Sequence, residues 1–375
     1  MNEKIAIITF TGGANYGNRL QNYALQEALK NYSENVYTLN CCTSDDILGW
    51  HKFLFAMKHV IKKISGKPHR LLYFKRKSAF DEFNKKYINF SNIYLKNNKA
   101  PKKIDSIFDV FVCGSDQIWN TNYKIVRDNI NNYLLSFAKE GKKVSFAASF
   151  GTKDVNSGYR ECFRKELMKF DAISVRENNG VDIVKDLSGR DAVVMPDPTM
   201  LLSKQDWDVI AKKPCYVKDG EKYVLTYFLG KKPDNFDLHI KKIQEQKGIQ
   251  KTINLDIEFF DTKQMSDKET YITSPEEFIW LISNAECVLT DSYHATVFSI
   301  IYGTQFCVYE RNMKGKNSSI GSRIDTLLEM FGLTEFKDDR NSPNIFPQEY
   351  DTAHCVEIFR KRREDAYTFL DEVFK

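Results

Sequence analysis

Short, continuous apolar runs recur through the first half of the chain, and most are followed by a polar loop and a stretch with helical spacing. Residues 5–10 form the first run, and leucines then repeat at helical spacing between residues 20 and 29. Unbroken apolar runs are typical of parallel strands that are covered on both faces. Further runs of this kind are residues 36–39, 108–113, 143–151, 172–175 and 192–195. The pattern predicts a βα repeat around a mostly parallel sheet.

A second series begins after a break at residues 203–221, which contains Pro214 and Gly220. Ser274 followed by Pro275 and two glutamates predicts a helix start, because serine caps a helix and proline fits its first position. We expect that helix to run to about residue 285. The predicted strands of this series are residues 223–230, 249–255, 287–290 and 305–309.

The length of the chain bears on its domain organisation. With 375 residues, the chain exceeds the size at which one hydrophobic core keeps growing, so we expect two domains. The predicted fold class is α/β, with two Rossmann-like domains facing across a cleft. We place an N-terminal domain at residues 1–205, a C-terminal domain at 206–350, and a closing amphipathic helix within 351–375.

Composition narrows the class of protein. A hydrophobic fraction of 42% with 13% aromatic residues indicates a folded globular chain. The eight cysteines form no CxxC pair and no His/Cys metal spacing, so we expect reduced thiols and no metal. The N-terminus lacks the layout of a signal peptide, and no apolar run approaches the roughly 18 residues of a membrane span. These features predict a soluble, cytoplasmic protein.

The formal net charge of +5 is unevenly distributed. Residues 47–80 contain nine Lys and Arg residues and no acid, mixed with aromatic residues such as Trp50 and Tyr73. One interpretation is contact with an anionic membrane or a lipid-linked substrate at the inner face of the cytoplasmic membrane. The other is an ordinary helical pair whose apolar side packs on the domain and whose lysines are solvated. No nucleic-acid partner is expected.

The segment 287–299 is the most informative for function. It predicts a buried strand, a tight polar loop and an apolar helix that opens at His294. Ligands bind at the carboxyl ends of strands in open α/β sheets, and a helix N-terminus attracts anions. A titratable imidazole therefore lies beside a predicted phosphate or carboxylate site. The alternative for His294 is a helix-capping or core imidazole.

Other loops that follow predicted strands add polar side chains to the cleft. Hydrogen-bonding groups of this kind suit a hydroxylated ligand, although helix capping is the alternative role for each. Arg176 follows a strand and suits an anion clamp, with a salt bridge to Asp171 or Glu177 as the alternative. Arg323 and Lys316 are further clamp candidates, with solvated surface charges as the alternative. The polar set is Asn15, Asn18, Ser115, Asp116, Gln117, Asn120, Arg176, Glu177 and Asp197.

Several common catalytic motifs are missing from the sequence. Gly12, Gly13 and Gly17 do not form GxGxxG, which leaves NAD binding without support. The chain also lacks GxxxxGK[ST], HExxH and GxSxG. The sequence therefore lacks the signatures of serine, cysteine and zinc hydrolases.

A set of short segments, taken in order and spacing, resembles the polysaccharide pyruvyl transferases from the first strand to about residue 310. The segments are Gly13–Asn18, Leu20–Leu25, Gly114–Asn120, Ser174–Glu177, Pro196–Thr199 and Thr290–Ala295. The resemblance implies a two-domain fold like that of the GT-B glycosyltransferases. It also implies an activity, because characterised members move the pyruvyl group of phosphoenolpyruvate onto two sugar hydroxyls to form a ketal.

By this resemblance, the chain is expected to modify a sugar or lipid-linked oligosaccharide of a bacterial surface polysaccharide, with phosphoenolpyruvate as co-substrate and no cofactor. His294, as imidazolium, is the expected acid that protonates the methylene carbon, and Asp116 is expected to orient or deprotonate a hydroxyl. The expected donor-binding residues are Arg176, Ser292, Ala295, Arg323 and Lys316. The expected acceptor-binding residues are Asn15, Asn18, Ser115 and Gln117.

The chain departs from the family pattern at one point. Many members have Arg-Leu-His where this chain has Ser292, Tyr293 and His294, so the histidine is kept and the arginine is absent. We expect Arg323 or Lys316 to supply the missing charge. Two other functions stay open at this point: a GT-B glycosyltransferase that uses a nucleotide sugar, and a non-catalytic member that binds a glycan.

Overall fold

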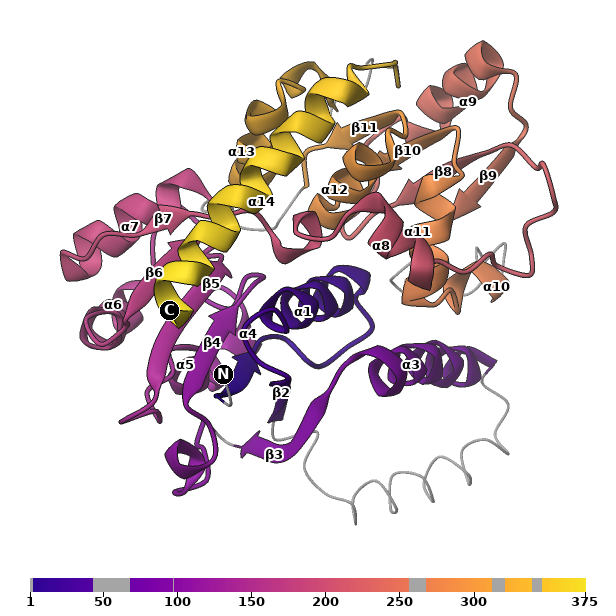
Figure 1. Ribbon diagram of the computed structural model, residues 1–375. Coiled ribbons are helices and arrows are strands. Elements are labelled where there is room, and N and C mark those ends of the chain that lie inside the picture. Colours follow the sequence, from indigo (N-terminus) through magenta and orange to yellow (C-terminus); the bar gives the residue numbers. More distant parts are fainter. Residues whose placement is uncertain (1–2, 43–67, 97, 256–267, 312–320, 339–345) are drawn as a thin grey trace.

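The computed structural model describes residues 3–42, 68–96, 98–255, 268–311, 321–338 and 346–375. Its strands form two parallel sheets with helices around each, and the C-terminal helix runs from one sheet to the other (Figure 1). We call these the N-terminal sheet and the C-terminal sheet.

The N-terminal sheet has seven parallel strands in the order β3-β2-β1-β4-β5-β6-β7. The chain adds β2 and β3 on one side of β1 and then returns to place β4 on the other side. A topological switch point therefore lies between β1 and β4, where ligands bind in such sheets. The strand bounds are β1 Lys4–Ile8, β2 Asn35–Cys42, β3 Phe90–Lys96, β4 Val110–Gly114, β5 Lys142–Ala148, β6 Ala172–Val175 and β7 Val193–Val194.

The C-terminal sheet has five parallel strands in the order β12-β11-β10-β8-β9. Its switch point lies between β8 and β10, and β10 precedes the predicted histidine helix. Two doubly wound sheets agree with the predicted fold class. The strand bounds are β8 Tyr223–Tyr227, β9 Lys251–Asn254, β10 Cys287–Thr290, β11 Phe306–Tyr309 and β12 Lys337–Asp338.

The helices connect the strands of each sheet. Ser274 caps the helix that follows it and completes a capping box with Glu277, as the serine–proline–glutamate pattern predicts. The helix bounds are α1 Tyr16–Leu29, α3 Pro68–Tyr87, α4 Lys124–Asp128, α5 Ile130–Tyr133, α6 Ser157–Leu167, α7 Asn178–Ser188, α8 Lys204–Ile210, α9 Phe236–Lys247, α10 Lys268–Tyr271, α11 Pro275–Ser283, α12 Tyr293–Tyr302, α13 Gly321–Phe331 and α14 Thr352–Phe374. Short 3₁₀ turns lie at η2 Ile104–Ser106, η3 Pro198–Met200 and η4 Thr334–Phe336.

The two halves of the chain share a hydrophobic core. Tyr16 of α1 stacks on Phe278 of α11, with ring centroids 4.4 Å apart, and donates its hydroxyl to the carbonyl of Thr273. Phe80 and Phe83 of α3 are buried in the same core. Because helices that follow the first strands pack on the C-terminal sheet, contacts hold the two sheets together. The proposed domain division at residues 205/206 stays a prediction.

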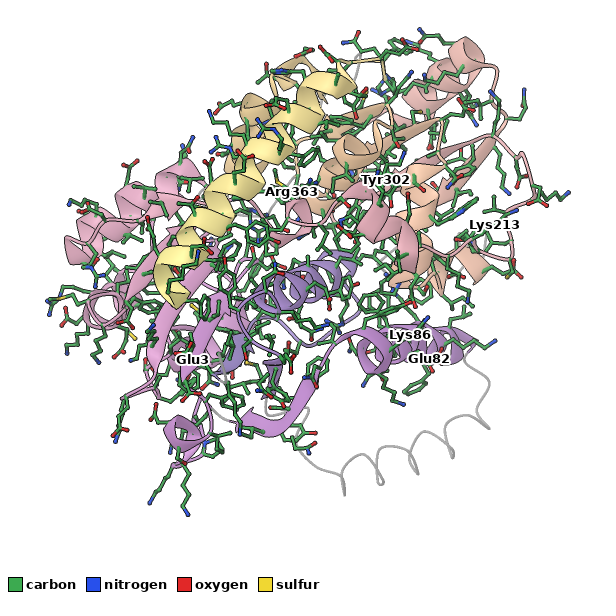
Figure 2. The ribbon with its side chains drawn as sticks, in the orientation of Figure 1. Glu3, Glu82, Lys86, Lys213, Tyr302 and Arg363 are labelled. Atoms are coloured by element: carbon green, nitrogen blue, oxygen red, sulfur yellow. The ribbon has the colours of Figure 1, made fainter. Side chains whose placement is uncertain are left out.

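Helix α14 ties the C-terminal end back to the N-terminal sheet. Its first half buries Phe359 in the core shared with the C-terminal sheet, and its second half buries Leu370 against β1 and β4. Arg363, labelled in Figure 2, donates hydrogen bonds to the carbonyls of Met200 and Leu202 between these two regions. The helix therefore spans both sheets and the connection between them.

Most predicted elements are present, and β3, α8 and β12 are among the elements that were not predicted. The edge strand β3 was missed because it mixes polar and apolar residues and is only partly buried. Helix α8 lies inside the segment taken as a break, where Ser203 caps it and Trp207 is buried. Strand β12 has two residues, too few to leave a periodic pattern.

The basic segment is only partly described, since residues 47–67 lie outside the described residues. In α3, Arg76 is buried and donates to the carbonyls of Ala14 and Tyr271, so one of the nine basic side chains has a structural role. Tyr73 and Phe74 are exposed on the same helix, at 50% and 38%. No helix within the described ranges is long and apolar enough to cross a bilayer.

We expect Leu370→Ala to lower the free energy of unfolding by about 2–5 kcal/mol, because it opens a cavity where α14 packs on the N-terminal sheet. Leu370 is fully buried, whereas Val356 of the same helix is 64% exposed. Val356→Ala is therefore the matched control and should change stability little. Chemical denaturation of both variants checks this, and equal effects would contradict the packing of α14.

Candidate active site

A cavity of about 290 Å³ lies between the two sheets. Its lining residues come after β1 and β4 in one sheet and after β8, β10 and β11 in the other. The cavity therefore lies at the carboxyl ends of the strands, beside both switch points, where this type of fold binds ligands. It is lined by Phe10, Gly12, Asn15, Asn18, Asp116, Gln117, Tyr123, Ile125, Leu229, Ser292, Tyr293, His294, Arg311 and Arg323.

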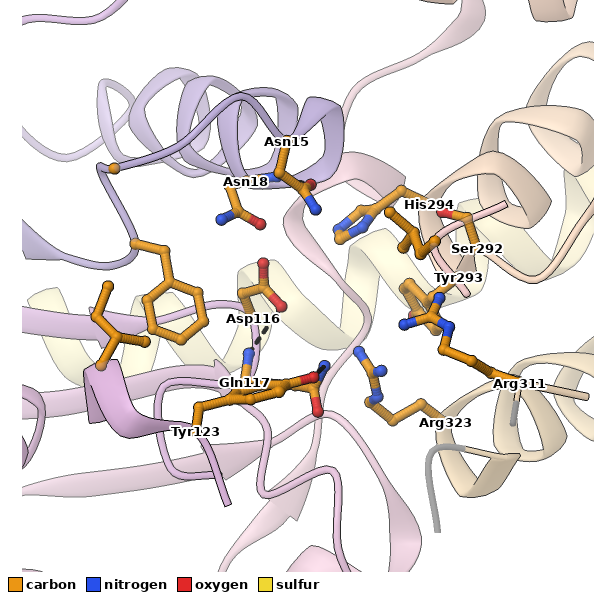
Figure 3. Close-up of a pocket in the computed structure, with 14 residues that line it drawn as sticks. Asn15, Asn18, Asp116, Gln117, Tyr123, Ser292, Tyr293, His294, Arg311 and Arg323 are labelled. Atoms are coloured by element: carbon orange, nitrogen blue, oxygen red, sulfur yellow. Dashed lines mark hydrogen bonds between the residues drawn. The ribbon is translucent and has the colours of Figure 1, made fainter. Parts of the chain in front are cut away.

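His294 enters the cavity from the first turn of α12. Ser292 caps this helix, accepting a hydrogen bond from the N–H of Ala295 at 3.4 Å, and α12 begins at Tyr293. Figure 3 shows the imidazole between Asn15 and Ser292. Its Nε2 lies 3.5 Å from Oδ2 of Asp197, which belongs to the other half of the chain.

Gly17 in the first turn of α1 allows this approach. A Cβ at position 17 would lie 2.0 Å from Nδ1 of His294 and 2.5 Å from its Cγ. No side chain fits at that distance, so the imidazole packs directly on the backbone of α1. The segment Gly13–Asn18 therefore leaves space for the histidine ring, in addition to supplying the amide side chains of Asn15 and Asn18.

Asp197 and Arg176 form a buried ion pair behind the histidine. The guanidinium of Arg176 lies 3.2 Å from Oδ2 of Asp197 and 3.6 Å from Oδ1 of Asp116. Burial alone would raise the pKa of Asp197, but the charge of Arg176 and then that of His294 outweigh burial and hold the pKa below its ordinary value. For Arg176, burial alone would lower the pKa, but the charges of Asp197 and then Asp116 outweigh burial and raise the pKa above its ordinary value. The carboxylate of Asp197 is therefore available to orient the imidazole.

The turn after β4 supports this ion pair. Ser115 donates from Oγ to Oδ2 of Asp197 at 3.1 Å and to the carbonyl of Ala147 at 2.9 Å. Gly114 has φ of 121°, and a Cβ there would lie 2.2 Å from the carbonyl oxygen of Phe146, so only glycine fits. The turn leaves Asp116 facing the cavity, with Oδ1 accepting from the N–H of Gln117 at 2.8 Å.

Arg323 brings a buried positive charge to the cavity wall. It is 4% exposed, and within the described part of the chain no carboxylate lies within 4.0 Å of its guanidinium. Burial, and next the charge of Arg176, lower the pKa of Arg323. Its guanidinium stands 5.8 Å from the ring centroid of Tyr293, and that of Arg176 stands 5.0 Å from the same ring. The site therefore holds a cation that an anionic ligand would stabilise.

Arg311 is a second arginine of the wall, and sequence reasoning missed it. Its Nε lies 3.1 Å from Oδ2 of Asp291, and its terminal nitrogen donates to the carbonyl of Asp291 at 2.6 Å. Asp291 also accepts from the N–H groups of Leu229 and Gly230. Arg311 follows the end of β11 by two residues, so the rule that selected Arg176 would have found it. Tyr123 and Phe10 also line the cavity and were not predicted, because aromatic residues beside a predicted strand are usually assigned to the hydrophobic core.

The structure brings most of the predicted site residues to the cavity and places others behind it. Six predicted residues are buried outside the lining: Arg176 and Asp197 in their ion pair, Ser115 as its support, Ala295 with its N–H taken by Ser292, Asn120 donating to Gln117, and Glu177 accepting from the N–H of Phe150. Arg176 does form a salt bridge, but its partners are Asp197 and Asp116 and not the predicted Asp171 or Glu177. Lys316 lies outside the described residues. The predicted residues that line the cavity are Asn15, Asn18, Asp116, Gln117, Ser292, His294 and Arg323.

Two doubly wound sheets with a cationic cavity at their facing strand ends define a GT-B-like α/β protein with a site for a small anionic ligand. The chain belongs to the polysaccharide pyruvyl transferase family, whose model matches residues 15–312. The resemblance that the motifs indicated is thereby confirmed.

Comparisons with individual proteins agree with this placement at the level of the fold. The UDP-GlcNAc 2-epimerase of Methanocaldococcus jannaschii has a similar structure, with a TM-score of 0.50, 12% identity, and coverage of 96% of this chain and 92% of that chain. General stress protein 30 of Bacillus subtilis is 25% identical over 215 residues. That match spans 56% of this chain and 59% of the relative.

We predict that Gly17→Ala destabilises the fold by about 1–3 kcal/mol, because the new methyl group displaces the His294 ring. In a His294→Ala background, the same substitution should cost little, since the clashing ring is gone. Denaturation of the two single variants and the double variant measures this coupling. Gly158→Ala, where a Cβ meets nothing within 4 Å, is the control. Additive effects would mean that His294 does not pack on Gly17.

Proposed function

We propose that this protein transfers the pyruvyl group of phosphoenolpyruvate onto two hydroxyls of a sugar in bacterial surface polysaccharide synthesis. The observation that carries the proposal is the buried Arg323 without a carboxylate partner among the described residues, in the same small cavity as His294. The cavity of about 290 Å³ is at the lower end of the range for small-molecule sites, about 300–1,000 Å³. That size suits a compact donor of this kind.

The donor carries two anionic groups, and two arginines face the cavity. Arg323 would bind one group with a charge-assisted hydrogen bond, which is stronger in a buried site than in water. Arg311 is partly neutralised by Asp291 and would bind the second group or the departing phosphate. Arg323 thus takes the role of the arginine that the family motif has at the position of Ser292, which itself lines the cavity.

His294 would act as the general acid. Its Nε2 faces Asp197 and its Nδ1 lies beside the backbone of Gly17, so a donor would have to reach the start of α1 to take the proton from Nδ1. The ionised Asp197 stabilises the imidazolium and fixes the ring plane, as a carboxylate does for histidine in other acid–base sites. No metal or redox cofactor is needed for this step.

The proposed reaction is balanced as follows. The imidazolium protonates the methylene carbon, which becomes a methyl group, and positive charge develops on the neighbouring carbon that bears the phosphate. One sugar hydroxyl forms a C–O bond to that carbon and loses its proton to Asp116. Cleavage of the carbon–oxygen bond to phosphate releases inorganic phosphate, and the second hydroxyl closes the ketal. Its proton passes to the neutral imidazole, which restores the imidazolium, and the proton on Asp116 leaves with the phosphate, which restores the carboxylate.

We predict that Arg323→Ala weakens binding of phosphoenolpyruvate by about 10- to 100-fold, the loss of one charged hydrogen bond. Ser292→Arg in the Arg323→Ala background should restore part of this affinity, because position 292 lines the same cavity. Arg160→Ala, which removes a surface arginine, is the control. Isothermal titration measures the dissociation constants, with uridine diphosphate as the comparison ligand. Unchanged affinity for phosphoenolpyruvate, or tighter binding of uridine diphosphate, would contradict the assigned donor.

We also propose that α3 contacts an anionic membrane and so brings the cavity to a lipid-linked acceptor. Tyr73, Phe74, Lys75 and Lys77 are exposed on this helix, and a mixture of aromatic and basic residues is typical of interfacial helices. The same helix is anchored to the body of the protein, because Arg76 donates to the carbonyl of Ala14 in the glycine-rich loop.

The protein should therefore float with mixed phosphatidylcholine–phosphatidylglycerol vesicles more than with phosphatidylcholine alone, and less as salt rises. Substitution of Tyr73 and Phe74 by serine should reduce flotation. Val209→Ser is the control, because Val209 is 83% exposed on α8. Equal flotation with neutral and anionic vesicles would rule out the membrane contact.

A further inference from the structure

The lining of the cavity is divided by charge between the two sheets. The arginines and the histidine, Arg311, Arg323 and His294, all come from the C-terminal sheet and its helices. The described lining residues of the N-terminal sheet include no Lys, Arg or His, and Asp116 is their only carboxylate. Figure 3 shows Asp116 on the opposite side of the cavity from Arg311. The lining therefore has its cations on the C-terminal side, whereas the N-terminal side contributes one carboxylate, which Arg176 contacts from outside the lining at 3.6 Å.

The N-terminal side also has an apolar wall. Phe10, Tyr123 and Ile125 line the cavity, and all three belong to one hydrophobic cluster. Phe10 is held in place by an edge-to-face contact with Tyr133, with centroids 5.5 Å apart. The hydroxyl of Tyr123 accepts a hydrogen bond from Nε2 of Gln117 at 3.2 Å, which fixes the ring. The wall is therefore preformed and partly accessible from the cavity.

Amides stand at the edge of this wall. Asn15 and Asn18 line the cavity from the start of α1, and Figure 3 shows both above Asp116. Oδ1 of Asn15 caps α1, whereas the side-chain amide of Asn18 has no hydrogen-bond partner within the described ranges. An unengaged amide beside a carboxylate offers both donors and acceptors to hydroxyl groups.

We propose that this side, which lines the cavity with no cation, selects an uncharged pyranose as the acceptor, with its C–H face on Tyr123 and Phe10 and its hydroxyls toward Asn18 and Asp116. A pyranose has an apolar C–H face and a hydroxyl edge, which matches an aromatic wall beside amides. A uronic acid or a phosphorylated sugar would bring a negative charge next to Asp116, where the lining has no cation of its own. Arg176 lies 3.6 Å from Asp116 outside the lining and is already shared with Asp197. The inference rests on the proposed function only in assigning the arginines to the donor.

The test is binding of methyl glycosides to the protein loaded with phosphoenolpyruvate, followed by saturation-transfer NMR and titration. The probes are methyl β-glucopyranoside, methyl β-galactopyranoside and methyl β-glucuronide. At least one neutral glycoside should receive saturation at its ring C–H protons, and the glucuronide should not. Tyr123→Ala should raise the dissociation constant of that glycoside by about 3- to 10-fold, whereas Tyr123→Phe should leave it close to wild type. Tyr94→Ala, at an exposed tyrosine on β3, is the control.

Each outcome decides one question. Binding of the glucuronide as tight as that of the neutral glycosides overturns the proposal, as do unchanged affinity in Tyr123→Ala and the absence of saturation for every glycoside. The affinity of Tyr123→Ala for phosphoenolpyruvate should stay within about twofold of wild type, which shows that the donor side is intact. If neutral glycosides bind through Tyr123 while phosphoenolpyruvate does not bind, the donor assignment fails and the acceptor inference stands.

Discussion

The buried contact between Asp197 and His294 is the constraint on which the site depends, because its two partners come from different halves of the chain. Arg176 at the end of β6 holds the Asp197 carboxylate at 3.2 Å, and that carboxylate faces the imidazole of α12 at 3.5 Å. Gly17 lets the ring lie directly on α1. A buried charge is costly unless it is paired, and Arg176 pairs with Asp197 within the N-terminal half, so the carboxylate is fixed where the imidazole of the other half meets it. The orientation of the proposed acid is thereby tied to the fold.

The same ion pair decides which arginine is left for a ligand. Arg176 is committed to Asp197 and Asp116, and Arg311 is shared with Asp291. Arg323 has no such partner among the described residues, and its pKa is lowered by burial and by the charge of Arg176. An anion in the cavity would remove that cost. Under the proposed function, Arg323 would supply the charge of the arginine that many other members of the family have at the position of Ser292.

Much of the fold could be predicted, because buried parallel strands such as β1 and β10 are continuous apolar runs and the Ser274 cap has a local signature. Strand β3 could not, since its pairing with β2 joins residues far apart in the sequence. Helix α8 was overlooked although Ser203 and Asp206 form a capping box like that of Ser274. For the site, the sequence indicated which loops contribute to the cavity, and His294, Asp116 and Arg323 from those predictions do line it. The direction of a side chain from its loop depends on packing, so Arg176, Ser115 and Ala295 could not be separated from the lining residues.

The central claim is that His294 protonates the methylene carbon of phosphoenolpyruvate during transfer to a sugar. The most direct measurement is mass spectrometry of the products formed in D₂O from phosphoenolpyruvate and the glycolipid extract of the source organism. The wild-type protein should form a pyruvyl ketal that carries one deuterium in its methyl group, and His294→Ala should form it about 100- to 10,000-fold more slowly. A product that forms only with a nucleotide sugar, or a ketal that His294→Ala forms at the wild-type rate, would contradict the claim.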